Sequence, residues 1–213
     1  MQRKSKNKII IGITGSYGSG KSTVARILKE KGAVILDADK IAHECIRKNK
    51  VAYDKLLRVF GKEILDNNRN IGRKKLGMKV FNNQALLRKL NKIVHPEVIR
   101  IIKASIKRKK GGVIILDAPL LLEAGLKKDV DKLIVVNISR NKQIARLIKK
   151  TSLNKHEILK RINSQIPLRK KIKLADFIID NNGTVASLNK QTKSLWISLV
   201  RLLRTRDQIA LLN

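Results

Sequence analysis

The residues best suited to chemistry form a glycine-rich segment near the start of the chain. Gly15–Ser22 reads Gly-Ser-Tyr-Gly-Ser-Gly-Lys-Ser and fits the pattern G-x-x-x-x-G-K-[ST] at every fixed position. In this pattern the glycines let successive backbone N–H groups face a chain of phosphates. The lysine, here Lys21, reaches the β- and γ-phosphates, and the final hydroxyl, here Ser22, binds Mg²⁺. The segment therefore predicts a site for a nucleoside triphosphate.

The residues on either side indicate a strand–loop–helix setting for this segment. Ile9–Ile13 is an apolar run that predicts a buried strand, and Val24–Leu28 begins a helical pattern. Near-continuous apolar runs that alternate with helical patterns indicate a parallel sheet covered on both faces. We therefore predict an α/β fold with a central parallel five-stranded sheet flanked by helices. The other predicted strands are residues 33–36, 113–116, 132–136 and 177–179.

Two carboxylates follow the second predicted strand. Asp37 and Asp39 are two residues apart, and on extended backbone such residues point to the same face. Ligands of open parallel sheets bind beyond the carboxyl ends of the strands, so one carboxylate could accept or orient the proton of an acceptor hydroxyl. The alternative role is to cap the next helix. We expect one of the pair to cap and favour Asp39 for catalysis.

A third carboxylate, Asp117, ends the strand predicted over residues 113–116. This is the position of a Walker B acid, where Asp117 could hold Mg²⁺ through water or orient Lys21. His43 and His95 have no partners at a metal-binding spacing, so no zinc site is predicted. His43 could line an acceptor pocket, whereas His95 is expected to pack or to cap.

Helical patterns account for most of the remaining chain. Residues 40–110 predict a helical insertion after the second strand, and Pro96 is expected in the first turn of a helix. Asn154, with Glu157 three residues later, predicts a capping box. One face of a final amphipathic helix is predicted to hold Val185, Leu188, Leu195, Leu199 and Leu202.

The composition is strongly basic. The chain holds 49 Lys and Arg against 16 Asp and Glu, which gives a net charge of +33 and suggests a polyanionic partner such as nucleic acid or an anionic membrane. However, the basic residues run from Arg3 to Arg206 without forming one block, and aromatic residues, which stack on bases, make up only 3%. We therefore favour a solvated basic surface over a dedicated nucleic-acid function.

A helix predicted after the fourth strand carries Gln143, Arg146, Lys149 and Lys150. The positive side chains among them could neutralise charge on a transferring phosphoryl group, or they could belong to the solvated basic face.

Other features of the sequence bear on the compartment. Cys45 is the only cysteine, which excludes an intrachain disulfide and fits a reducing cytosol; we expect its thiol to be packed. No apolar run approaches the roughly 18 residues of a membrane span. The basic start Met1–Lys4 precedes too short an apolar run for a signal peptide, so we expect a frayed tail. These features predict a cytoplasmic protein with no membrane association.

Over nearly its whole length the chain resembles the bacterial dephospho-coenzyme A kinases. The most specific similarity is Asp37–Glu44, which follows the second strand. The other matching blocks are Gly12–Ala25, Arg73–Gly77, Val80–Asn82, Leu90–Pro96, Asp117–Glu123, Gln143, Arg146, Arg161, Gln165, Pro167, Lys171, Ala175–Asp176 and Ile179–Asn181.

The resemblance implies a P-loop kinase fold that transfers the γ-phosphoryl group of ATP, with Mg²⁺, to the ribose 3′-hydroxyl of dephospho-coenzyme A. It implies that Asp39 activates this hydroxyl, together with Lys21 as the second catalytic residue. The nucleotide would be bound by Gly15, Ser16, Gly18, Ser19, Gly20, Lys21, Ser22, Thr23, Arg146, Lys150 and Asn181. The acceptor would be bound by Asp37, His43, Arg73, Pro119, Leu120, Leu121 and Glu123, and the metal by Ser22 and Asp117.

The resemblance also implies a division of one domain, residues 1–213. Residues 8–39, 111–150 and 174–213 would form the nucleotide-binding core, 40–110 the acceptor-binding insertion and 150–173 a basic lid. Three positions depart from the family pattern: Lys150 replaces a lid arginine and supplies a point charge instead of a fork, Gly72 replaces an acid and Leu122 a phenylalanine. We expect a monomer without a specific nucleic-acid partner.

Two other functions remain open at this point. A P-loop kinase for another nucleoside or nucleotide is the first, and a basic nucleic-acid-binding ATPase is the second. The blocks Asp37–Glu44 and Asp117–Glu123 favour the dephospho-coenzyme A kinase over both.

Overall fold

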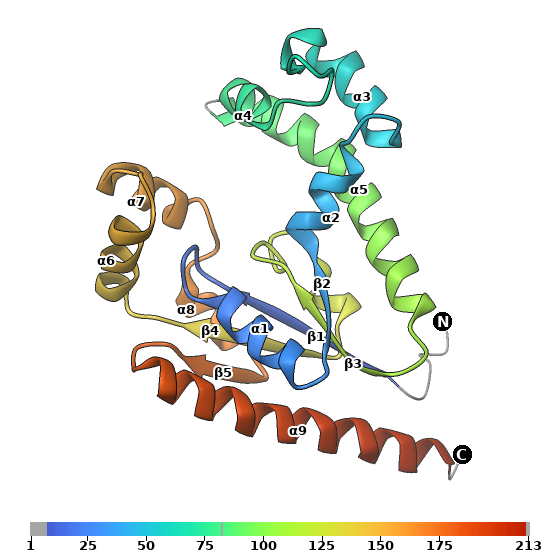
Figure 1. Ribbon diagram of the computed structural model, residues 1–213, viewed down its shortest axis with the longest axis vertical. Coiled ribbons are helices and arrows are strands. Elements are labelled where there is room, and N and C mark those ends of the chain that lie inside the picture. The colour runs from blue at the N-terminus through green and yellow to red at the C-terminus, as the bar shows by residue number, and fades with distance from the viewer. Residues whose placement is uncertain (1–7, 82, 212–213) are drawn as a thin grey trace. The chain divides into compact units, whose positions relative to one another are not determined.

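The computed structural model describes residues 8–81 and 83–211, which form two compact units (Figure 1). The first unit contains the chain up to Leu36 and from Lys110 onward, and the second contains Asp37–Lys109. The predictions for Met1–Lys4 and Asn82 lie outside the described residues.

A five-stranded sheet organises the first unit. Its strand order is β2-β3-β1-β4-β5, and β1 pairs in parallel with β3 and with β4, as β4 does with β5. The strands form where the sequence is rich in Ile, Val and Leu, residues that suit a sheet buried on both faces. The five predicted strands are thus confirmed as β1 (Lys8–Gly15), β2 (Val34–Asp37), β3 (Gly112–Asp117), β4 (Lys132–Asn137) and β5 (Phe177–Asp180).

Two helices, α1 (Lys21–Glu30) and α9 (Val185–Leu211), cover one face of this sheet (Figure 1). Alternate strand residues such as Ile11, Ile115 and Ile134 pack with Leu199 of α9 in one apolar cluster. The predicted amphipathic face of α9 is confirmed at Leu188, Leu195 and Leu199 and is wrong at Val185. Val185, the first residue of α9, is 68% exposed.

The segment after β3 packs on the opposite side of β1. A Cβ atom at Gly12 would lie 2.6 Å from Cδ1 of Leu121, so only glycine lets this segment approach β1 so closely. The segment includes the short helix η2 (Leu126–Asp129), and α8 (Leu168–Lys173) also contacts β1 and β4.

Helices α6 (Arg140–Lys150) and α7 (Lys155–Asn163) follow β4 and contact each other. The capping box predicted at the start of α7 is present: the Asn154 side chain accepts from Glu157 N, and the Glu157 carboxylate accepts from Asn154 N. Both bonds satisfy backbone donors that a helix start leaves open.

The second unit is helical. It consists of α2 (Ala38–Cys45), α3 (Val51–Phe60), η1 (Lys62–Ile64), α4 (Arg73–Phe81) and α5 (Gln84–Arg108). Its own apolar cluster includes Leu56, Phe60 and Leu76. Cys45 is 1% exposed, which confirms a packed thiol, and this burial raises its pKa to about 11.

The predicted place of Pro96 is wrong. Pro96 lies inside α5, which begins after Asn83, whose side chain accepts from the backbone N–H groups of Ala85 and Leu86. A proline removes one helical hydrogen bond. The burial of Val98 and Ile102 further along α5 shows that packing carries the helix past this point.

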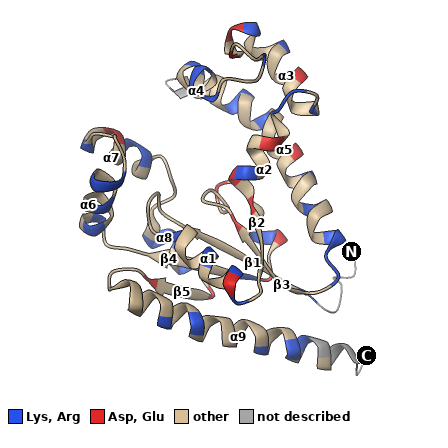
Figure 2. Ribbon diagram, viewed as in Figure 1, with Lys and Arg blue, Asp and Glu red and all other residues tan. Residues whose placement is uncertain are grey.

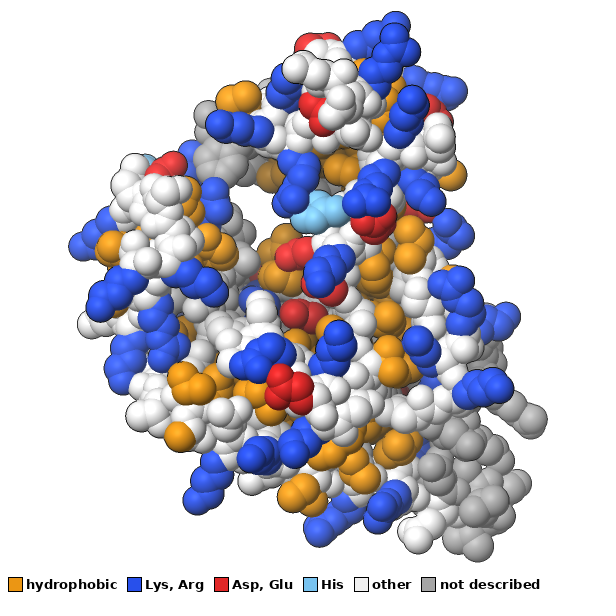
Figure 3. Space-filling model, viewed as in Figure 1, with side chains coloured by type: hydrophobic (Ala, Val, Ile, Leu, Met, Phe, Trp, Pro, Cys, Tyr) orange, Lys and Arg blue, Asp and Glu red, His pale blue; other side chains and the backbone are white. Residues whose placement is uncertain are grey.

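Lys and Arg are distributed over the helices of both units (Figure 2). On the face drawn in Figure 3 they are scattered among other side chains, as the sequence predicts. Within the described residues, no helix combines the length and apolar character needed to cross a bilayer.

Candidate active site

The glycine-rich segment forms a tight loop between β1 and α1. Gly18 and Gly20 have φ angles of 74° and 95°, which favour glycine, and Gly20 is the N-cap of α1. A Cβ atom at Gly15 would lie 2.5 Å from the Ser19 Oγ. The loop therefore brings its backbone N–H groups and the positive end of α1 to one place, which is the requirement for binding phosphates.

Lys21, Ser22 and Thr23 form the first turn of α1. Lys21 is only 8% exposed, whereas the Ser22 side chain is open to solvent and Thr23 is half-buried. The sequence prediction that Lys21 and Ser22 share the helix start next to the loop is thus confirmed.

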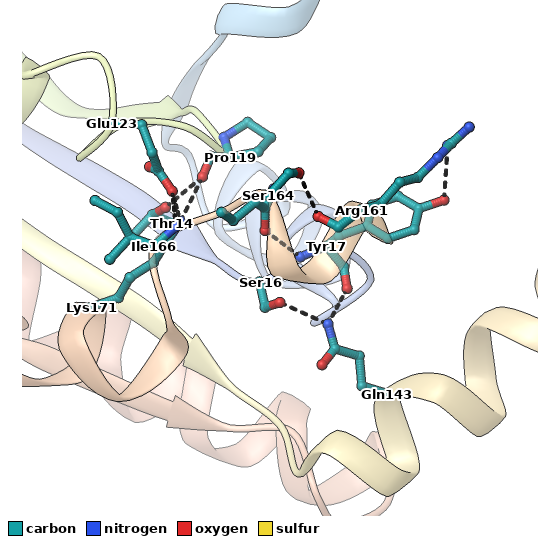
Figure 4. A network of polar contacts seen from close by, with 11 residues as sticks. Thr14, Ser16, Tyr17, Pro119, Glu123, Gln143, Arg161, Ser164, Ile166 and Lys171 are labelled. Atoms are coloured by element: carbon teal, nitrogen blue, oxygen red, sulfur yellow. Dashed lines mark hydrogen bonds and ion pairs between the residues drawn. The ribbon is translucent and has the colours of Figure 1, made fainter. Parts of the chain in front are cut away.

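Side chains from distant segments hold the loop from outside. Asn181, which follows β5, is 7% exposed and donates its Nδ2–H to the carbonyl of Ser19 at 2.7 Å. Gln143 of α6 donates its Nε2–H to Ser16 Oγ at 2.8 Å and also to the Tyr17 carbonyl (Figure 4). These bonds leave the loop little freedom to rearrange when a ligand arrives.

Arg161 of α7 and Gln165, which follows this helix, also contact the loop. The Gln165 side chain accepts from Tyr17 N at 2.8 Å. The Arg161 guanidinium lies 5.6 Å from the centre of the Tyr17 ring, within the range of a cation–π contact, and its Nη1 is 3.5 Å from the Tyr17 hydroxyl (Figure 4). These contacts join the predicted lid segment to the phosphate loop.

Asp117 is the last residue of β3 and pairs with Ile13 of β1. Ile13 lies two residues before Gly15 in the chain, so Asp117 stands beside the strand that enters the loop. The next residues continue along β1, because Ala118 N donates to the Ile13 carbonyl at 3.2 Å and Thr14 Oγ1 donates to the Pro119 carbonyl at 3.0 Å.

The predicted acceptor residues after Asp117 differ in exposure. Leu120 is 45% exposed and Pro119 is half-buried, but Leu121 is fully buried and packs in the core. Glu123 is half-buried, and its Oε1 accepts from Ile166 N at 2.9 Å and lies 2.8 Å from Lys171 Nζ. In this arrangement Leu121 can shape the segment but cannot touch a ligand.

Arg146 and Lys150 are exposed on α6. The same unit has a cavity of about 650 Å³. Its lining combines Ser16 of the loop with polar side chains of α6 and with the segment that joins α7 to α8, and it includes Arg140, Gln143, Gln165, Ile166 and Arg169.

The second unit carries the other predicted acceptor residues. Asp37 is the N-cap of α2, and its Oδ1 accepts from Lys40 N at 2.9 Å, so the prediction that one aspartate caps is confirmed. The same-face argument for Asp37 and Asp39 is wrong, because the chain turns helical at Ala38 and places Asp39 in the first turn of α2, open to solvent.

A cavity of about 560 Å³ in the second unit contains two predicted residues, His43 and Arg73. Lys40, Arg47, Asn70 and Glu44 line it as well, and the Glu44 carboxylate pairs with Arg47. Cationic side chains thus outnumber the carboxylate around a space large enough for part of an anionic ligand. His95 lies elsewhere, half-buried on α5, and its burial lowers its pKa.

Comparison with known proteins decides the family. The profile of the dephospho-CoA kinase family matches residues 9–187. A dephospho-CoA kinase from Carboxydothermus hydrogenoformans is 45% identical over 185 residues, which cover 85% of this chain and 90% of that protein. The chain belongs to the dephospho-CoA kinase family.

Solved structures agree with this assignment. TT1252 from Thermus thermophilus has a TM-score of 0.79 and 31% identity, covering 91% of this chain and 98% of that one. A dephospho-CoA kinase from Campylobacter jejuni has a TM-score of 0.66 and 30% identity, covering 87% and 94%. The protein is therefore a kinase with the P-loop kinase fold that the sequence predicts.

Reasoning from individual residues gave no role to Thr14, Tyr17 or Lys171 of this dephospho-CoA kinase family member. Arg161, Gln165 and Lys171 stood out only through the family resemblance. Tyr17 occupies a variable position of the pattern G-x-x-x-x-G-K-[ST], and this position alone indicates that its side chain lies at the loop. Across the described part of the chain, no group of three or more His, Cys, Asp and Glu side chains could hold a metal ion.

Proposed function

We propose that this kinase transfers the γ-phosphoryl group of ATP to the ribose 3′-hydroxyl of dephospho-CoA and so produces CoA, the last step of CoA synthesis. The main observation in support is the phosphate loop, which a hydrogen bond from Asn181 holds in place and which leads to Lys21 at the start of α1. The family profile, which matches residues 9–187, supports the same function.

The loop residues fit the triphosphate of ATP. The positive φ angles of Gly18 and Gly20 shape the backbone cradle, and Lys21 adds a cation for the β- and γ-phosphates. Ser22 and Asp117 fit Mg²⁺, since this ion commonly takes a hydroxyl and one carboxylate, partly through water, together with phosphates. When bound, Mg²⁺ neutralises the charge on the phosphates. The remaining proposed nucleotide-binding residues are Gly15, Ser16, Ser19, Thr23, Arg146, Lys150 and Asn181.

Asp39 is the proposed general base. The Asp39 carboxylate lies in the first turn of α2, open to solvent, where it can accept the proton that leaves the 3′-hydroxyl as the hydroxyl oxygen attacks the γ-phosphorus and ADP leaves. Lys21 offsets the negative charge of the transferring group. Asp37 supports Asp39 by fixing the start of α2.

Acceptor-binding residues are proposed in each unit by itself. His43 and Arg73 would face its phosphates from their cavity, and Pro119, Leu120 and Glu123 would contact it with Leu121 as buried support. Residues 150–173 are proposed to act as the lid, with Arg146 and Lys150 adding positive charge. Residues 40–110 are proposed as the acceptor-binding insertion of a single domain.

One coupled assay tests the proposal. ATP consumption should depend on dephospho-CoA and should be far slower with adenosine or with nucleoside monophosphates as the acceptor. Mass spectrometry should find one added phosphate on the ribose 3′ position. Equal or faster turnover with a nucleoside monophosphate would replace the proposal with another nucleotide kinase.

We further propose a cytoplasmic monomer that binds neither membranes nor specific nucleic-acid sequences. Scattered cations attract polyanions without base preference, so binding to DNA or RNA should weaken steeply between low and physiological salt (Figure 3). Filter binding at both salt concentrations and sedimentation of the free protein would measure these properties. Nucleic-acid-stimulated ATP hydrolysis without dephospho-CoA would favour a nucleic-acid-binding ATPase.

A further inference from the structure

Lys171 of α8 is a lysine with no exposed surface. Its Nζ lies 2.8 Å from Glu123 Oε1 and donates to the Pro119 carbonyl at 3.1 Å. Removing an ammonium group from water is costly unless charge and hydrogen bonds compensate. The carboxylate and the carbonyl supply that compensation here, so the position of this side chain is tightly defined.

The two partners of Lys171 are themselves joined to other segments. Glu123 Oε1 also accepts from Ile166 N at 2.9 Å, and the Pro119 carbonyl also accepts from Thr14 Oγ1 at 3.0 Å (Figure 4). One ammonium group therefore connects the end of β1, the segment after Asp117, and the segment between α7 and α8.

Ile166 belongs to a stretch that is held at successive residues. Ser164 is the C-cap of α7, the next residue, Gln165, accepts from Tyr17 N, and Pro167 is the N-cap of α8. The carboxyl-terminal end of the proposed lid is thus fixed to the phosphate loop through Gln165 and to Glu123 through Ile166. We call residues 164–167 the lid anchor.

We propose that Lys171 is a positioning residue for phosphoryl transfer, which acts through Glu123 and Pro119 to hold the lid anchor in register with the phosphate loop and Asp117. The proposal rests on the proposed function. A methionine would fill much the same volume without the cost of burying a charge, so stability alone does not call for lysine here. Only the ammonium group supplies directed bonds to both Glu123 and Pro119.

The test compares the variants K171M, K171M/E123Q and K193M. Lys193 is the control because it is an exposed lysine on α9, outside the proposed lid and the proposed binding residues. In the double variant the amide oxygen introduced by E123Q can still accept from Ile166 N, while the carboxylate charge that K171M leaves unpaired is gone. For each variant we would measure steady-state kinetics and thermal unfolding. We would also measure hydrogen exchange of residues 151–168 with and without a non-hydrolysable ATP analogue.

We expect K171M to raise the KM for ATP about tenfold, the effect of losing one or two directed hydrogen bonds. It should also lower kcat and remove most of the protection from exchange that the ATP analogue gives residues 151–168. K193M should match the wild type in all three. The double variant should regain thermal stability because no unpaired charge remains, yet keep the raised KM and the lost protection.

Two results would overturn the proposal. One is a folded K171M variant with wild-type kinetics and wild-type protection by the analogue. The other is a double variant in which activity and protection return together with stability, since Lys171 would then only balance the charge of Glu123. If K171M does not fold, the double variant decides alone, and if that variant also fails to fold, Lys171 is a stability residue and the proposal falls.

The exchange measurement also separates this proposal from the proposed function. It needs binding of an ATP analogue and no acceptor. A wild-type protein that shows the protection but does not phosphorylate dephospho-CoA would contradict the acceptor assignment and leave the role of Lys171 in place.

Discussion

The phosphate loop in the first unit and the cavity in the second unit differ in how their polar groups are held. Ser16, Tyr17 and Ser19 of the loop bind side chains far away in the sequence, from Gln143 and Asn181 among others. The ion pairs around the cavity join residues only three apart in the sequence, as in Arg47–Glu44 at 3.1 Å and Lys40–Asp37 at 3.8 Å.

This difference has an energetic meaning. Donors that are already fixed need no reordering when charge develops on the transferring group, which is the main source of electrostatic catalysis. Long exposed side chains lose freedom only when a ligand orders them, and that cost reduces affinity. Changes at the loop should therefore act on ATP and on the rate, whereas changes at the cavity should act on affinity for the acceptor.

The largest expected effect is that of K21A. Loss of the cation on the β- and γ-phosphates should lower kcat about 10³- to 10⁵-fold, the range known for a cation that stabilises the transferring group. The matched control is K29A, which removes an exposed lysine from the last turn of the same helix. Circular dichroism should show an intact fold in both, and near-normal turnover of K21A would remove the P-loop assignment.

The second largest effect is expected for D39N. The amide keeps the size of the side chain but cannot accept the proton, so kcat should fall about 10²- to 10⁴-fold while the KM for ATP changes little. D37N is the comparison, because Asp37 caps α2 through Lys40 N and an asparagine can still cap. A crippled D37N variant beside an active D39N variant would show that the wrong carboxylate was chosen.

The sequence predictions succeed where the interacting residues are close together in the chain, and they miss contacts between distant residues. The strand, loop and helix around Gly15–Ser22 are specified by adjacent residues, and the structure reproduces them. The hydrogen bonds that hold the loop were not predictable in this way, because Gln143 and Asn181 lie 127 and 162 residues from the groups that they bind. Only folding brings such partners together.

In the second unit two predictions from neighbouring residues are wrong, because the backbone there has a different conformation from the one assumed. Asp37 and Asp39 would point to the same face only if the strand continued, but Asp37 is the N-cap of α2, which begins at the next residue. Pro96 likewise has the geometry of a first helical turn, yet the apolar face of α5 carries the helix through it. Tertiary packing outweighed local preference at Pro96, whereas at Asp37 a local helix cap ended the extended backbone.

A smaller effect, on the loop itself, is expected for N181A. The variant leaves the Ser19 carbonyl without the 2.7 Å bond from Asn181, and the unsatisfied group should loosen the loop. We expect the KM for ATP to rise about tenfold, with little change in the KM for dephospho-CoA. N182A is the control, since Asn182 accepts from Ser139 N instead of bracing the loop. A larger rise in the KM for dephospho-CoA than in the KM for ATP would contradict the proposal that the loop acts on ATP and the cavity on the acceptor.

The smallest effect is expected for R73A in the second unit. Arg73 lines the cavity, but it is exposed, and exposed charge pairs are worth only about 0.2–1 kcal/mol. The KM for dephospho-CoA should therefore rise about two- to fivefold, and the KM for ATP should stay unchanged. K74A is the control because Lys74 is an exposed neighbour on α4 that does not line the cavity. Added salt should shrink the difference between R73A and the wild type, because a screened charge contributes less. A change of a hundredfold, or one that salt leaves intact, would mean that binding orders and desolvates Arg73 as tightly as the loop residues, and the contrast between a preorganised donor site and an open acceptor site would not hold.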